Sequence, residues 1–150
     1  PSEMRATIMH KAGDVRIDDL ITQARSAGLE VSLVRVGESR PLPSGTQMAH
    51  FRICQEALTN VMKHAGPGAR VAVTESWRDT ELALTITDAG GDRGAVVAMD
   101  GEPLAALGLG LIGMRERAEL VGGSCEAGPT EDGYQVRAVL PFRLPGEEAE

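Results

Sequence analysis

Residues 51–65 read FRICQEALTNVMKHA, and their spacing predicts a helix that carries two stripes. Apolar side chains recur at steps of three and four residues, which places them on one helix face: Cys54, Ala57, Leu58, Val61 and Ala65. Glu56, Asn60 and Lys63 follow the same rhythm and form a polar stripe beside it. We interpret the stretch as a core helix that is also one wall of a site. A solvated helix face stays open as the alternative, because Glu and Asn four residues apart are common.

Length and composition indicate one globular domain. The chain has 150 residues, of which 42% are hydrophobic and 25% charged, so it can bury a sizeable core. Its net charge of −7 disfavours non-specific binding of nucleic acid. No apolar run approaches the ~18 residues of a membrane span. We therefore expect a fragment that binds no nucleic acid, crosses no membrane and lies in the cytoplasm. Membrane anchoring of a longer parent protein stays open.

Periodicity and turn residues predict the other elements. Besides residues 51–65, helices are expected over 18–27 and 109–121. Ser44 or Thr46 is a candidate cap for the central helix. The helix over 109–121 is expected to face inward through Ile112, Ala118 and Val121. The predicted strands are residues 29–36, 70–77, 81–87, 124–127 and 134–140.

This order of elements predicts the fold class. Two hairpins and an earlier strand, interrupted by helices, favour a two-layer α/β sandwich. Its sheet would be mixed but mostly antiparallel, with helices on one face. Cys54 lies in the apolar stripe and is expected to be a small buried side chain rather than a reactive thiol. The two cysteines of the chain make neither a disulfide framework nor a zinc site.

A carboxylate and glycines follow the strand over 81–87, in the sequence DAGGD. A carboxylate only accepts hydrogen bonds, so Asp88 would suit an exocyclic amine such as that of adenine. A glycine beside it lets the backbone come close to a ligand. An ordinary turn is the alternative, because Asp and Gly are frequent turn residues.

A second glycine-rich stretch, GLGLIG at residues 108–113, opens a predicted helix. Such an entry can present backbone N–H groups to phosphates. A dinucleotide-binding fold would need this motif directly after a first strand, whereas here it comes late and after an irregular segment. The alternative is that the glycines only make this segment of the chain flexible and bind no ligand.

Taken together, four stretches occur in the order of a known family. QEALTNVMKHA, DAGG, GLGLIGMRERAELVGG and GYQVRAVLP resemble the ATP-binding catalytic domain of sensor histidine kinases, in the nitrate-sensor-like branch. The resemblance covers residues 29–140. It implies the Bergerat fold, shared with gyrase, heat-shock chaperone and mismatch-repair ATPases.

The resemblance also implies site residues and ligands. Glu56 falls on the acidic position that helps to activate the attacking group, and Asn60 on the ligand of Mg²⁺. Asp88 falls on the adenine-binding aspartate, and residues 92–107 on a mobile lid. Besides Asn60 and Asp88, the implied contacts to ATP are Lys63, Gly90, Gly108, Leu109, Gly110, Leu111, Gly113 and Met114.

The implied activity is transfer of the γ-phosphoryl group of ATP to a histidine on a separate dimerisation domain of the same protein. A response regulator would accept the group next, and the parent protein would be a homodimer. Residues 1–14 would be the end of the dimerisation helix or a linker. Residues 15–143 would form the catalytic domain and residues 144–150 a flexible tail.

Two positions depart from the family pattern, which often reads D-N-G-x-G. Ala89 replaces the Asn, and position 92 holds Asp92 instead of glycine. A degenerate nucleotide-binding or scaffold domain therefore remains an alternative. A serine kinase of the anti-sigma type on the same fold is a second alternative, disfavoured by the sequence GMRER followed by AELVGG.

Overall fold

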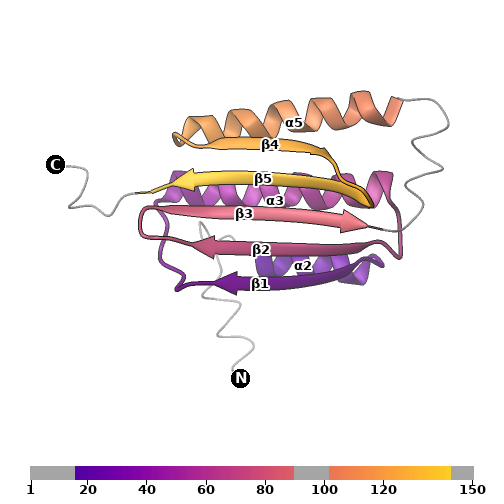
Figure 1. The fold of residues 1–150 in the computed structure, drawn as a ribbon. Coiled ribbons are helices and arrows are strands. Elements are labelled where there is room, and N and C mark those ends of the chain that lie inside the picture. The colour runs from indigo at the N-terminus through magenta and orange to yellow at the C-terminus, as the bar shows by residue number, and fades with distance from the viewer. Residues whose placement is uncertain (1–15, 90–101, 143–150) are drawn as a thin grey trace, which may run out of the picture.

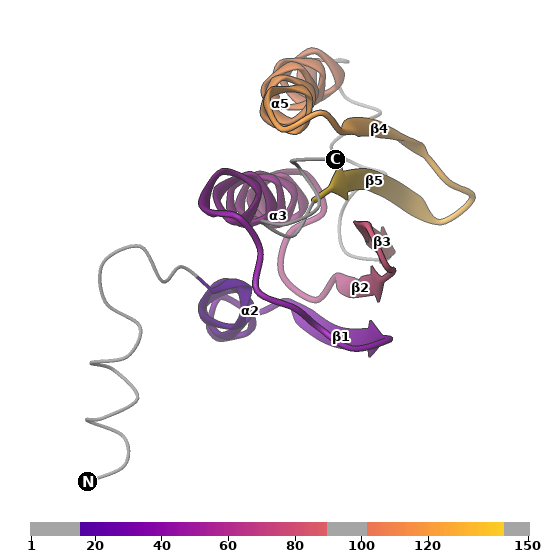
Figure 2. The same cartoon turned by 90° about the vertical axis from the view of Figure 1, so that its left-hand side faces the viewer.

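The computed structural model describes residues 16–89 and 102–142, with the backbone alone for residues 102–109. Within these ranges, three helices lie on one face of a five-stranded sheet with the order β1-β2-β3-β5-β4 (Figures 1 and 2). The helices are α2 (Ile17–Ser26), α3 (Ser44–His64) and α5 (Glu102–Leu120). The strands are β1 (Glu30–Val36), β2 (Arg70–Trp77), β3 (Glu81–Ala89), β4 (Ser124–Pro129) and β5 (Gly133–Pro141). Gly90, Asp92 and the two predicted terminal segments lie outside the described residues.

The sheet is mixed, as the sequence predicts. β1 pairs in parallel with β2, whereas β2–β3, β3–β5 and β5–β4 are antiparallel. The predicted two-layer α/β sandwich with helices on one face is therefore confirmed. Within the described ranges, no helix combines the length and apolar character that a membrane crossing requires.

The central helix α3 begins seven residues earlier than the 51–65 stretch predicts. Its first residue is Ser44, and Pro43 in an extended conformation precedes it. No side chain caps this end, so the predicted cap at Ser44 or Thr46 is wrong. Thr46 is instead buried. The helix ends before Gly66, whose φ of 83° is the left-handed conformation that glycine adopts without strain.

Helix α5 also begins earlier than predicted, at Glu102, so residues 102–107 of the expected lid are helical. Pro103 is tolerated in a first helical turn, and the Leu and Ala residues that follow favour a helix. The inward position assigned to Ile112 is wrong, because 52% of this residue is exposed. It lies about 120° around the helix from the buried Ala118, since residues follow at about 100° each. Met114, which is 1% exposed, takes the inward position instead.

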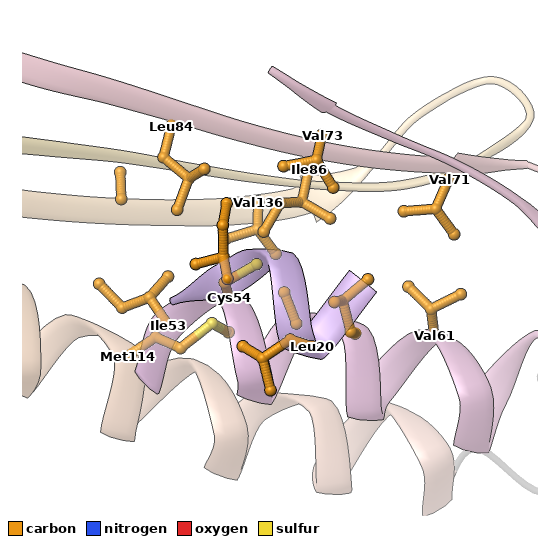
Figure 3. Close-up of a cluster of buried hydrophobic side chains, with 14 of the residues drawn as sticks. Leu20, Ile53, Cys54, Val61, Val71, Val73, Leu84, Ile86, Met114 and Val136 are labelled. Atoms are coloured by element: carbon orange, nitrogen blue, oxygen red, sulfur yellow. The ribbon is translucent and has the colours of Figure 1, made fainter. Parts of the chain in front are cut away.

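The core lies between the helices and the sheet (Figure 3). The predicted apolar stripe of α3 is buried along its length, from Cys54 to Ala65. Burial raises the pKa of the Cys54 thiol to about 12 and that of Cys125 to about 11. Both thiols are therefore neutral near pH 7, which fits the prediction of a buried, unreactive Cys54.

A carboxylate that sequence patterning does not single out lies in this core. Glu75 on β2 follows Val71 and Val73 on the inner face of the sheet and is 1% exposed. Its Oε1 accepts hydrogen bonds from Arg35 Nε (2.8 Å) and Trp77 Nε1 (3.0 Å). Its Oε2 lies 3.0 Å from His50 Nε2 on α3. The cluster therefore joins β1, β2 and α3.

These partners also set the acidity of Glu75. Burial raises its pKa, but the hydrogen bonds from His50, Arg35 and Trp77 outweigh burial and bring the pKa down from 4.5 to about 2. Because the pKa is lower in the folded chain, the charged form stabilises the fold fully above about pH 4.5. That contribution is lost as the pH falls toward 2.

We expect Glu75→Gln to lower the free energy of unfolding at pH 7 by about 3 kcal/mol, because it breaks a buried charged cluster. The difference in free energy of unfolding between this variant and the unsubstituted chain should shrink between pH 4.5 and 2. In that range Glu75 becomes protonated in the unsubstituted chain, and its stabilising contribution is lost. Urea unfolding at a series of pH values measures both effects. The control is Glu81→Gln, since Glu81 pairs with Arg78 at the surface. If the loss in free energy of unfolding caused by Glu75→Gln is the same at every pH, the charged Glu75 carboxylate does not stabilise the fold as stated.

Candidate functional site

The polar stripe of α3 faces α5 across a pocket of about 350 Å³. Glu56, Asn60 and Lys63, predicted from spacing alone, all line it. Glycines from the second glycine-rich stretch lie opposite, so the structure brings these two motifs together. Its lining in the described part of the chain is Glu56, Asn60, Lys63, His64, Gly110, Gly113, Met114 and Arg117. Among the residues that the structure describes, Glu56, Asn60 and Lys63 form no hydrogen bond or ion pair through their side chains.

Gly110 brings the backbone of α5 close to this stripe. A Cβ atom at position 110 would lie 2.9 Å from Glu56 Oε2 and 3.0 Å from Asn60 Nδ2. The glycine therefore leaves room for both side chains and allows α3 and α5 to approach each other closely. At Gly113 an added Cβ would meet nothing within 4 Å, because this position opens onto the pocket.

Asp88 lies on the other side of Asn60, inside strand β3. It pairs with Val71 on β2 and Tyr134 on β5, and it is 4% exposed. Asp88 itself is thus a strand residue directed at the helices, while the glycines of the turn interpretation lie outside the described residues. A cavity of about 10 Å³ adjoins it, which is room for one water molecule. Its lining is Ala57, Asn60, Val61, Ile86, Asp88, Tyr134 and Val136.

Asn60 is shared by the two spaces, because it lines both the pocket with Glu56 and the cavity with Asp88. It is 8% exposed and lies on a rigid helix, so its position is fixed by the packing of α3. One amide side chain therefore connects a buried carboxylate on the sheet with an open, charged groove between two helices.

Gly133 is a site residue that the sequence motifs do not mark by position. It pairs with Ala89, and an added Cβ there would collide with the Asp88 carbonyl and come 2.7 Å from Asp88 Oδ1. A side chain at position 133 would thus displace the Asp88 carboxylate. The motif GYQVRAVLP begins with this glycine, but the sequence alone does not show that it lies against Asp88.

Ala89 lies away from the cavity at Asp88. Successive strand residues point to opposite faces of a sheet, and Ala89 is half-buried on the face without helices. The departure from the family pattern at this residue therefore leaves the lining of the Asp88 cavity unchanged.

The remaining predicted nucleotide contacts differ in where they lie. Leu111 is partly buried against the core and lines neither of them. Met114 lines the pocket but also belongs to the core. Gly108 and Leu109 lie in α5 where only the backbone is described, and Gly90 lies outside the described residues.

The pocket offers oxygen donors that fit a hard cation held jointly with a ligand. The amide of Asn60 and the carboxylate of Glu56 are one helical turn apart, and both line the pocket. Mg²⁺ prefers oxygen ligands, keeps several waters and is commonly held by one or two protein groups plus substrate phosphates. No group of three or more His, Cys, Asp and Glu side chains that could hold a metal occurs in the described part of the chain.

Comparisons with solved structures support the fold. The catalytic domain of the histidine kinase ThkA superposes with a TM-score of 0.61 at 13% identity, over 84% of this chain and 86% of that one. The mycobacterial sensor histidine kinase MprB superposes with a TM-score of 0.59 at 23% identity, over 85% of this chain and 93% of that one.

Sequence comparisons identify relatives and a family. Sensor histidine kinase YxjM of Bacillus subtilis (strain 168) is 35% identical over 124 residues. UhpB of Salmonella typhimurium, a signal transduction histidine-protein kinase/phosphatase, is 35% identical over 105 residues. The matches cover 81% and 68% of this chain but only 28% and 19% of those proteins. The model of the histidine kinase-, DNA gyrase B-, and HSP90-like ATPases matches residues 45–144, and the chain therefore belongs to this family.

Proposed function

We propose that the chain binds Mg²⁺-ATP and donates the γ-phosphoryl group to a histidine on a separate dimerisation domain. The observation that carries this proposal is the position of Asn60 between Asp88 and the pocket of Glu56, Lys63 and the glycines. One ATP molecule could then place its adenine amine at Asp88, extend past Asn60 and place its triphosphate in the pocket. The relatives named as histidine kinases support the same assignment.

Each residue has a role that its chemistry suits. Asp88 accepts a hydrogen bond from the exocyclic amine of adenine. Lys63 supplies a positive charge to phosphate oxygens, and the glycines of α5 let the backbone lie close to the nucleotide. Asn60 holds Mg²⁺, which neutralises phosphate charge when bound.

The transfer needs no covalent intermediate on this chain. A ring nitrogen of the acceptor histidine forms a bond to the γ-phosphorus, the bond from that phosphorus to the bridging β,γ-oxygen breaks, and ADP leaves with that oxygen. Glu56 polarises the attacking ring by accepting its other N–H. Catalysis rests on position and charge neutralisation, as is usual in phosphoryl transfer. A response regulator then takes the phosphoryl group, the parent protein is a homodimer, and this domain of it lies in the cytoplasm.

The cavity at Asp88 must widen before a base can enter, because about 10 Å³ holds only one water. Asn60, Tyr134 and Ile86 are among its walls. Entry of a base by this route would therefore displace α3 relative to the end of the β3–β5 pair. Asp88 also lines a separate pocket of about 540 Å³ beside β1 and β2.

The first test of the proposal replaces the shared amide. Asn60→Ala should abolish Mg²⁺-dependent binding of ATP, because it removes the proposed metal ligand. Titration calorimetry with and without Mg²⁺ measures the affinity, and circular dichroism checks the fold. Thr59→Ala is the matched control, since Thr59 is the exposed neighbour that lines neither space. Equal Mg²⁺-dependent affinity in Asn60→Ala and the unsubstituted chain would refute the metal role.

A second test separates the site from the stability of the fold. Gly110→Ala should leave stability unchanged or raise it by up to about 1 kcal/mol, because alanine favours a helix. It should still weaken ATP binding, since the new methyl group displaces the Glu56 and Asn60 side chains. Glu116→Ala introduces alanine at an exposed position of α5 that lines neither space, and it should keep its affinity. Equal affinities in the two variants would contradict the role of the close approach at Gly110.

The transfer itself is tested with γ-labelled ATP and a histidine-containing dimerisation domain of the parent protein. We expect label on that domain that acid removes and alkali leaves, as for phosphohistidine. Acid-stable label would favour the serine kinase. Binding of ATP without any transfer would favour a nucleotide-binding module without kinase activity.

A further inference from the structure

Helices α3 and α5 run in opposite directions beside the pocket (Figure 1). Near the start of α3, a Cβ at Gly45 would lie 3.7 Å from Val121, just beyond the end of α5. Farther along, Gly110 of α5 faces Glu56 and Asn60. Moving from Gly110 toward the end of α5 therefore leads toward the Glu56 end of the groove and away from Lys63.

Arg117 lies in this direction on the same face of α5 as the glycines. Positions 110, 113 and 117 recur at three- and four-residue steps, and all three line the pocket. Arg115, two residues earlier in the same MRER sequence, is turned away, because its Nε donates to the Cys125 carbonyl at 3.3 Å. Within the described residues, the Arg117 side chain forms no hydrogen bond or ion pair.

The directions of the side chains bring two cations toward the middle of the groove. A helical side chain leans toward the N-terminus of its own helix. Since the helices are antiparallel, Lys63 leans toward Asn60 from one end, and Arg117 leans toward Gly113 from the other. Glu56 and Asn60 lie between them, so the groove has a positive group at each end.

We propose that Arg117 binds the terminal phosphate of the nucleotide. This inference rests on the proposed function, because it assumes a nucleotide whose base is at Asp88 and whose phosphates pass Asn60. The phosphate chain then runs toward Glu56, and Arg117 is the cation at that end of the groove. The planar guanidinium can donate two parallel hydrogen bonds to phosphate oxygens, which a lysine cannot. Arg117 thereby places the γ-phosphorus next to Glu56.

The test compares two nucleotides that differ by one phosphate. Binding of ADP and of adenosine 5′-(β,γ-imido)triphosphate, both with Mg²⁺, is measured by calorimetry for the unsubstituted chain and for Arg117→Ala. We expect the substitution to weaken binding of the triphosphate analogue about tenfold or more, as for one lost charge-assisted hydrogen bond, and ADP binding less than about twofold. Arg117→Lys should recover part of the loss.

The matched control is Arg137→Ala, which removes the same charge from the exposed face of β5, on the side of the sheet without helices. It should leave both affinities unchanged. If Arg117→Ala weakens both nucleotides equally, or neither, the assignment of Arg117 is overturned while the proposed function stands. If the unsubstituted chain binds neither nucleotide, the proposed function fails, and this inference fails with it.

Discussion

Helix α3 has to satisfy two neighbours at once, and this constraint places the whole site. Its apolar face is buried against the sheet, and the adjoining polar face meets α5. Each large aliphatic side chain on the buried face contributes about 1.5–3 kcal/mol, so rotating the helix would cost several such contributions. The orientation of Glu56 and Asn60 is thus a consequence of core packing. No separate device is needed to hold them at the groove.

The cluster at Glu75 fixes α3 near its start, at His50. Its carboxylate accepts hydrogen bonds from Arg35 on β1 and Trp77 on β2, and it contacts His50 on α3. These contacts tie the start of the helix to β1 and β2, the two strands at one edge of the sheet. His50 precedes Asn60 by ten residues, or about 15 Å of helix. The buried carboxylate therefore anchors the start of the helix that carries the site, while packing along α3 sets the orientation of Glu56 and Asn60.

Periodicity predicted most of the fold, because strands and amphipathic helices expose their burial pattern in the sequence. β2 has the predicted bounds, and the order of elements and the single layer of helices are as expected. The errors have local causes. A proline supports the start of α3 without a capping side chain, and α5 has glycines that obscure its period, which led to the wrong inward position for Ile112. Glu75 and His50 escaped prediction because their pairing joins residues 25 positions apart.

The sequence identified the residues of the site but not how they are arranged in space. Spacing placed Glu56, Asn60 and Lys63 on one stripe, and the structure puts all three around one pocket. That Gly110 lies against two of them, and that Gly133 makes room for Asp88, depends on contacts between distant segments. Such contacts follow from tertiary packing, which periodicity does not encode.

The small cavity at Asp88 has a thermodynamic consequence. As described, it holds one water, so a larger ligand that enters it must displace one of its walls, such as Ile86 or Tyr134. If only a fraction of the molecules has those walls displaced, the apparent dissociation constant is the intrinsic constant divided by that fraction. Under the proposed function, looser packing at Ile86 or Tyr134 would therefore strengthen nucleotide binding while it weakens the fold.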